Sequence, residues 1–226
     1  GEGMAVLCGD ALLTEAFIVL SQTPATKRYG AREYVSELAR CGSSKQLIGG
    51  QVMDLEGESK KLGKRELVRI HEAKTAALLT TSLRLGAMTA NASPTQLAAL
   101  TNFGYHLGLA FQVIDDVLDY DGDANTMGKN LGDDLREGKS TLPLIFAMQR
   151  GTPSQCALIK NAIEQGDIGA LADIAEIVRS TGAMQATRQA ASDEAQLALH
   201  ALEAMPASEY KTALADIAEQ LLDRQT

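Results

Sequence analysis

The sequence predicts an all-α protein that folds as a single helical bundle, and three observations favour this fold class. Alanine is the commonest residue, at 34 of 226 positions, whereas aromatic residues make up only 4%. Apolar residues recur at spacings of three and four, and no long segment alternates Val, Ile and Thr as strands do. No repeat, linker or change in composition marks a second domain, so residues 1–226 are interpreted as one domain of roughly eight to ten helices.

The helices are expected, in chain order, where the apolar residues keep this spacing. These segments are residues 6–20, 67–88, 97–118, 159–178 and 198–222, with breaks at Pro24, at Ser93 and Pro94, across 122–138, at 151–153 and at Pro206. Ser93 followed by Pro94 and Gln96 is typical of a helix start, because Ser can cap the first turn and Pro fits within it.

Residues 85–114 contain no Asp, Glu, Lys or Arg, which suggests either a buried helix or a membrane span. Pro94 divides the segment, and polar residues such as Asn102 and His106 interrupt it too often for the roughly 20 apolar residues that a bilayer requires. We therefore expect a core helix and no membrane span. The chain shows no signal-peptide pattern, and its three scattered cysteines favour a reducing, cytoplasmic location.

The net charge of −8 argues against nucleic acid as a partner, and the acidic residues are concentrated in one stretch. Residues 115–137 contain eight acids and two bases. On a helix, Gln112, Asp115, Asp116 and Asp119 lie within an arc of about 100°. Mg²⁺ prefers one or two carboxylates together with water and phosphate oxygens. The sequence therefore predicts a Mg²⁺ site at these three aspartates, the alternative being a solvated acidic helix end.

Three lysines are candidates for binding a diphosphate. Lys74 precedes a helical segment without charge as far as Arg84, and burying an ammonium there is costly unless an anion meets it. The alternative is a lysine whose stem packs while its ammonium reaches water. Lys129 and Lys139 flank the acidic stretch, where they could hold diphosphate together with a metal.

These residues belong to a recognisable set of motifs. The segments FQVIDDVLD (111–119) and GKNLGDDLREGKSTLPL (128–144) resemble the second aspartate-rich region of the trans-isoprenyl diphosphate synthases. GDALLTEAF (9–17), GGQVMDL (49–55) and HEAKTAALL (71–79) match the same family in order and approximate spacing. The resemblance implies an all-α bundle around a central cavity, a homodimer, and Mg²⁺-dependent condensation of an allylic diphosphate with isopentenyl diphosphate.

The resemblance also implies roles for individual residues. Asp115, Asp116 and Asp119 correspond to the second metal-binding motif, with Asp115 the expected direct ligand. Lys74 and Lys129 match lysines that bind the allylic diphosphate, and Lys139 is a further candidate. Thr75 and Gln112 match polar residues near the developing carbocation, whose charge their dipoles would stabilise.

The sequence departs from the family pattern in one respect. The first aspartate-rich motif and the arginine pair that follows it are absent from these 226 residues. We expect a piece of a longer natural chain, the alternative being a degenerate homologue. GGQVMDL resembles short-chain synthases that make farnesyl or geranylgeranyl diphosphate, whereas GDDLREGKSTLPL resembles longer-chain ones. We expect a short-chain product. Other hypotheses are a non-catalytic modulating subunit of such a synthase and a class I terpene cyclase.

Overall fold

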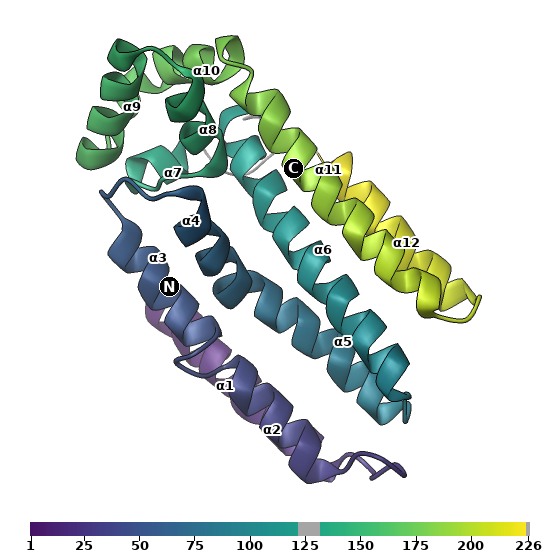
Figure 1. Cartoon of the computed structure of the whole chain (residues 1–226). Coiled ribbons are helices and arrows are strands. Elements are labelled where there is room, and N and C mark those ends of the chain that lie inside the picture. Colours follow the sequence, from purple (N-terminus) through teal and green to yellow (C-terminus); the bar gives the residue numbers. More distant parts are fainter. Residues whose placement is uncertain (122–131, 225–226) are drawn as a thin grey trace.

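The computed structural model describes residues 1–121 and 132–224, and these residues form helices and connecting turns without a strand (Figure 1). The α-helices are α1 (Glu2–Gln22), α2 (Ala31–Cys41), α3 (Leu47–Gly57), α4 (Lys64–His71), α5 (Ala77–Thr89), α6 (Pro94–Asp121), α7 (Asp133–Arg136), α8 (Leu142–Arg150), α9 (Pro153–Gln165), α10 (Leu171–Ser180), α11 (Ala183–Ala201) and α12 (Glu209–Leu222). A π-helix, Glu72–Ala76, joins α4 to α5, and short 3₁₀ turns lie at Ile168–Ala170 and Leu202–Ala204. The all-α prediction is confirmed. The described part of the chain contains more α-helices than the eight to ten expected, because several are short.

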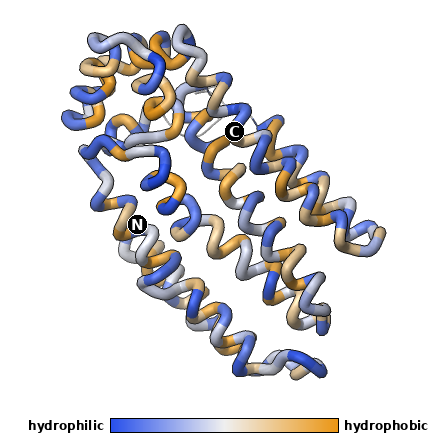
Figure 2. The backbone as a smooth tube through the Cα atoms, viewed as in Figure 1, coloured by the Kyte–Doolittle hydropathy of each residue, from blue (hydrophilic) through white to orange (hydrophobic). Residues whose placement is uncertain are grey.

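The bundle is organised around α6, which runs through its middle. This helix packs most extensively against α11 on one side and α5 on the other (Figure 1). Alanines of α11, among them Ala191 and Ala195, are fully buried against α6 and allow the two helices to approach closely. On the other side, a Cβ atom at Gly108 would lie 2.5 Å from the Ala76 Cα, so only glycine fits where α6 crosses the π-helix. In Figure 2, α11 and α12 alternate between hydrophilic and hydrophobic residues, as amphipathic bundle helices do.

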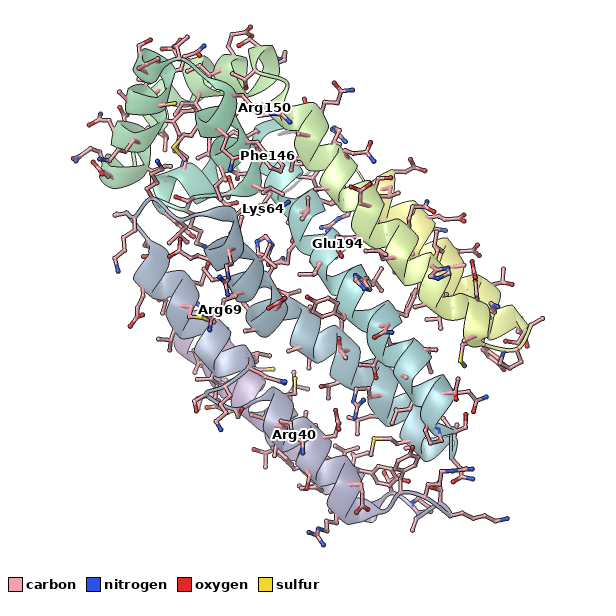
Figure 3. All side chains as sticks on the ribbon, in the orientation of Figure 1. Arg40, Lys64, Arg69, Phe146, Arg150 and Glu194 are labelled. Atoms are coloured by element: carbon pink, nitrogen blue, oxygen red, sulfur yellow. The ribbon has the colours of Figure 1, made fainter. Side chains whose placement is uncertain are left out.

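Helices α7 to α10 gather at one end of the bundle and form a second hydrophobic cluster (Figure 1). Its buried members include Leu135, Leu144, Ile159 and Ile174, and Tyr120 at the end of α6 packs into the same cluster. The side chain of Phe146 on α8 also meets α4, because the Lys64 ammonium lies 5.4 Å from its ring centroid (Figure 3). Helix α8 is thereby held next to the start of α4.

The predicted helix boundaries are confirmed at α6 and revised elsewhere. The Ser93 N–H donates to Gln96 Oε1 at 2.9 Å, and the Gln96 N–H donates to Ser93 Oγ at 3.3 Å, which makes a capping box. The expected segment 67–88 is helical but contains the π-helix. The expected segment 159–178 is broken at Gly166, which adopts a left-handed conformation with φ of 61°.

Two helices, α1 and α6, are long and apolar enough to cross a membrane by length and composition alone. Half of the apolar window of α6 is buried inside the bundle, as the core-helix prediction requires. None of the corresponding window of α1 is buried, and this helix packs mainly on α2. Large apolar side chains of α1 are 44–68% exposed: Met4, Val6, Leu7, Leu12, Leu13, Ile18 and Val19.

Candidate active site

A cavity of about 280 Å³ lies where the C-terminal end of α6 meets α3, α4, the π-helix and the segment between α7 and α8. Every predicted site residue that the structure describes lines this cavity: Lys74, Thr75, Gln112, Asp115, Asp116, Asp119 and Lys139. Lys129, the remaining predicted residue, lies outside the described residues. The fold therefore brings together residues from three separate sequence segments.

The π-helix presents Lys74 and Thr75 to the cavity. Five residues form this wider turn directly after α4, and such turns inside helices are frequent at functional sites. Helix α3 packs against the turn through Gly50, where an added Cβ atom would lie 2.4 Å from the Lys74 nitrogen. The close approach of two backbones fixes the position of Lys74 relative to α3.

Asp115 lines the cavity, and two neighbouring side chains contact its carboxylate. The Arg224 guanidinium forms an ion pair with Asp115 Oδ1 at 2.9 Å, and the Gln112 amide donates to Oδ2 at 3.3 Å. The same guanidinium lies 5.0 Å from the ring centroid of Phe111. The Asp115 side chain is 26% exposed, so it remains accessible from the cavity.

Asp116 is buried, and its carboxylate faces the protein interior. Its Oδ2 accepts a hydrogen bond from the Leu142 N–H at 2.9 Å, and its Oδ1 lies 3.9 Å from His71 Nε2. Burial raises the pKa of Asp116 well above its usual range, and the nearby Asp134 carboxylate adds to this. Burial also lowers the pKa of His71 to about 4, so the imidazole is neutral at pH 7. These two side chains connect α4, α6 and the start of α8.

Asp119 lies one turn after Asp115, as the helical spacing predicts. It is largely buried, and its Oδ1 accepts a hydrogen bond from the Asp134 N–H at 3.4 Å. Asp134, from α7, lines the cavity as well. Helix α7 thus lies beside the end of α6 and adds a carboxylate to the same site.

The lysines meet an acid that sequence reasoning did not single out. Asp54 Oδ2 lies 2.6 Å from Lys74 Nζ and 3.6 Å from Lys139 Nζ. Burial lowers the pKa of Lys139, but the hydrogen bond to Glu137 and the charge of Asp54 outweigh it, so that pKa is raised overall. In the sequence, Asp54 is marked only by its place in GGQVMDL (49–55), and nothing there indicates its lysine partners.

The residues present fit a divalent cation only in part. No group of three His, Cys, Asp or Glu side chains within residues 1–121 and 132–224 is arranged to hold a metal. Asp115 and Asp119 nevertheless present two carboxylates to one cavity, and Mg²⁺ characteristically takes one or two carboxylates and completes its shell with water and substrate phosphates. The donor set therefore suits a metal that arrives with a phosphorylated ligand.

Comparisons with known proteins agree on one family. The sequence profile of that family, described as Polyprenyl synthetase, matches residues 1–181. Octaprenyl diphosphate synthase of Escherichia coli is 35% identical over 225 residues, which cover 99% of this chain and 68% of the relative. Farnesyl diphosphate synthase of Escherichia coli is 38% identical over 189 residues, 82% of this chain and 62% of the relative.

A solved structure shows the same fold. The polyprenyl synthase from Caulobacter crescentus, complexed with calcium and isoprenyl diphosphate, superposes with a TM-score of 0.89 at 34% identity. The superposition covers 100% of this chain and 67% of that protein. The chain thus spans about two thirds of the length of these relatives.

Proposed function

The chain belongs to the polyprenyl synthetase family, and we propose that it acts as a prenyltransferase that joins an allylic diphosphate to isopentenyl diphosphate. The observation that supports this most strongly is the composition of the cavity. Two lysines, the carboxylates of Asp115 and Asp119, and the polar pair Thr75 and Gln112 line one hollow at the end of a buried apolar helix. Ionising an allylic diphosphate requires cations for the leaving group and electronegative groups near the allyl cation.

Lys74 and Lys139 bind the allylic diphosphate and neutralise charge that builds up as the carbon–oxygen bond breaks. Lys129 is proposed to join them. The Gln112 amide donates to Asp115, and this bond orients the carbonyl dipole of Gln112. That dipole and the Thr75 hydroxyl stabilise the positive charge on the allyl group. The departing diphosphate accepts the proton that is lost when the new double bond forms.

Asp115 and Asp119 are proposed to hold Mg²⁺, with Asp115 as the direct ligand. The metal would then replace Arg224 as the partner of the Asp115 carboxylate. When bound, Mg²⁺ supplies Lewis-acid stabilisation of the diphosphate leaving group. Asp116 belongs to the same motif, and its bond to the Leu142 N–H fixes the end of α6 so that Asp115 faces the cavity. The calcium in the related Caulobacter crescentus structure supports a divalent cation in this family.

For the product, we propose a short-chain diphosphate, as GGQVMDL indicates, with a longer-chain product as the alternative. The relatives include both classes: the octaprenyl synthase matches 99% of this chain, and a short-chain isoprenyl diphosphate synthase of Methanothermobacter thermautotrophicus matches 100%. Product length is measurable by chromatography of the reaction products after removal of the diphosphate.

We further propose that two copies pair through α1. An apolar helix without a buried face requires a covering partner. Its seven exposed apolar side chains lie on every side of the helix, so a second copy would cover one face of it. Sedimentation should give a dimer, and Leu12→Glu should give a monomer. The exposed Ile217→Glu on α12 serves as the control. A monomeric parent protein at micromolar concentration contradicts this proposal.

A cytoplasmic location is proposed from cysteine chemistry. Cys8, Cys41 and Cys156 are all free thiols, and Cys41 is buried between helices. Persistent free thiols are typical of a reducing compartment. Fractionation of the native host should find the protein with the cytoplasmic enzymes.

The experiment that tests the activity uses the longest natural gene product that contains this sequence. It is incubated with labelled isopentenyl diphosphate and an allylic diphosphate, with MgCl₂ or with EDTA. We expect metal-dependent formation of elongated diphosphates and a loss of at least about 100-fold in Asp115→Ala. Glu176→Ala, which alters an exposed ion pair on α10, should retain full activity. Unchanged turnover in Asp115→Ala rejects the assignment. Release of hydrocarbons instead of elongated diphosphates indicates a cyclase.

A further inference from the structure

Asp54 is placed in the cavity by the close packing of α3 on the π-helix. Gly50 and Asp54 lie one turn apart on the same face of α3. Gly50 lets the backbone of α3 approach the Lys74 backbone, and the Asp54 carboxylate then meets the end of the same lysine side chain. The Asp54 side chain is only 14% exposed. Its position is therefore set by the fold.

One oxygen of Asp54 contacts two ammonium groups that come from different elements. Because Lys74 Nζ lies 2.6 Å and Lys139 Nζ 3.6 Å from this oxygen, the two nitrogens are at most about 6.2 Å apart. Lys139 Nζ also pairs with Glu137 at 2.5 Å, but the Asp54 oxygen is the counter-ion that both ammonium groups share. Without it, two ammonium groups this close repel one another. A diphosphate has anionic oxygens on two adjacent phosphates, so one molecule can contact both groups.

We propose that Asp54 is a positioning residue that serves as a resident anion. It holds Lys74 and Lys139 together in the empty site, and it gives up these contacts when the diphosphate of a substrate or product binds to the two lysines. This inference rests on the proposed function, and it assigns to Asp54 an effect on diphosphate affinity. Before binding, the carboxylate keeps the lysines at a spacing that suits one diphosphate. After binding, it remains beside the incoming anion and repels it, which weakens the complex and favours release of the inorganic diphosphate product.

The direction of the effect follows from comparing two contributions. Replacing Asp54 by Asn removes one negative charge from a partly buried site next to a multiply charged ligand. The same change loosens the lysines, but ordering a lysine side chain costs less than repulsion between close charges in such a site. Asn has the shape of Asp, and its carbonyl oxygen still accepts a hydrogen bond from Lys74. Asp54→Asn should therefore bind diphosphate more tightly than the parent protein.

The test is isothermal titration of the purified protein with inorganic pyrophosphate at one fixed concentration of MgCl₂. We expect the dissociation constant to fall at least about fivefold in Asp54→Asn. Glu176→Gln removes the same single charge at an exposed site on α10 and should leave the constant unchanged. A purely structural role of Asp54 predicts the opposite sign, because a distorted site binds more weakly.

A second measurement follows the lysines directly. Limited acylation with acetic anhydride, read by peptide mass spectrometry, should modify Lys74 and Lys139 faster in Asp54→Asn than in the parent protein. Lys160, paired with Glu164 on α9, serves as the internal control. Pyrophosphate should protect both cavity lysines over the same concentration range in the parent protein.

The possible outcomes separate this inference from the proposed function. If the parent protein binds pyrophosphate and Asp54→Asn binds it equally or more weakly, this inference is wrong and the proposed function stands. Binding by Asp54→Asn alone supports the resident anion. Binding by neither protein contradicts both proposals.

Discussion

Gly50 is the position where a single methyl group tests how the site is built. In Gly50→Ala the new Cβ would lie 2.4 Å from the Lys74 nitrogen, 2.7 Å from the Ala73 carbonyl carbon and 2.8 Å from the Lys74 Cα. These are backbone atoms, so no side-chain rotation relieves the contact and α3 must move away from the π-helix. Overpacking of this kind costs about 3 kcal/mol, at the upper end of the usual range. The better helix propensity of alanine returns about 1 kcal/mol. The expected loss is about 2 kcal/mol.

Thermal unfolding followed by circular dichroism measures this effect. For a domain of this size, a loss of about 2 kcal/mol lowers the midpoint by roughly 4–8 °C. Gly86→Ala is the matched control, because Gly86 lies within α5 and its Cβ would meet nothing within 4 Å. That variant should be more stable than the parent protein by about 1 kcal/mol. If Gly50→Ala is as stable as Gly86→Ala, the close packing of α3 on the π-helix is refuted.

Three other variants test separate parts of the structure. Glu37→Gln should lower the free energy of unfolding in urea by about 2 kcal/mol, because it leaves the half-buried Arg84 without its carboxylate partner at 2.5 Å. Pyrophosphate binding should be unchanged, since this ion pair lies outside the cavity, and weaker binding would contradict that separation. Folding lowers the pKa of His71 from 6.5 to about 4, so the unfolded chain binds the additional proton as the pH falls below 6.5. In EDTA, the free energy of unfolding of the parent protein should therefore fall by about 2 kcal/mol more than that of His71→Gln between pH 7 and pH 5. If the two free energies of unfolding change in parallel with pH, His71 is not buried as described. Thr152→Ala removes the side chain that caps α9 and should cost about 1 kcal/mol, whereas the exposed Ser154→Ala should cost less.

The sequence predicted the features of the fold that depend on neighbouring residues. The start of α6 at Ser93 and Pro94 is a local capping pattern, and the structure contains the two hydrogen bonds that the pattern requires. The orientation of Asp115 and Asp119 follows from helical geometry alone, once residues 97–118 are recognised as a helix. Local rules suffice for both features.

Two local changes in the helical backbone were not predicted. Periodicity does not distinguish the π-helix at Glu72–Ala76 from ordinary helix, since one additional residue in a turn barely alters the pattern. The predicted segment 159–178 runs through Gly166, although only glycine readily adopts the left-handed conformation found there.

At the site, partners that come from distant segments were not predicted. Asp54 and Arg224 lie 20 and 109 residues from the side chains they pair with, and no local pattern indicates such partners. Both acid–base pairs depend on how segments distant in the sequence pack together, which the sequence pattern does not specify. The sequence therefore predicted the candidate ligands, whereas the structure identified the residues that hold them in position.

This cavity is proposed to bind a metal and a diphosphate together, and a crystal structure with Mn²⁺ and an allylic diphosphate analogue is the decisive test. We expect an anomalous peak at coordination distance, about 2.1 Å, from an Asp115 carboxylate oxygen, with the diphosphate in contact with Lys74 and Lys139. Asp115 should then be separated from Arg224. A diphosphate bound elsewhere would contradict this proposal. So would a cavity at saturating ligand in which the Asp115–Arg224 and Lys74–Asp54 ion pairs both stay intact.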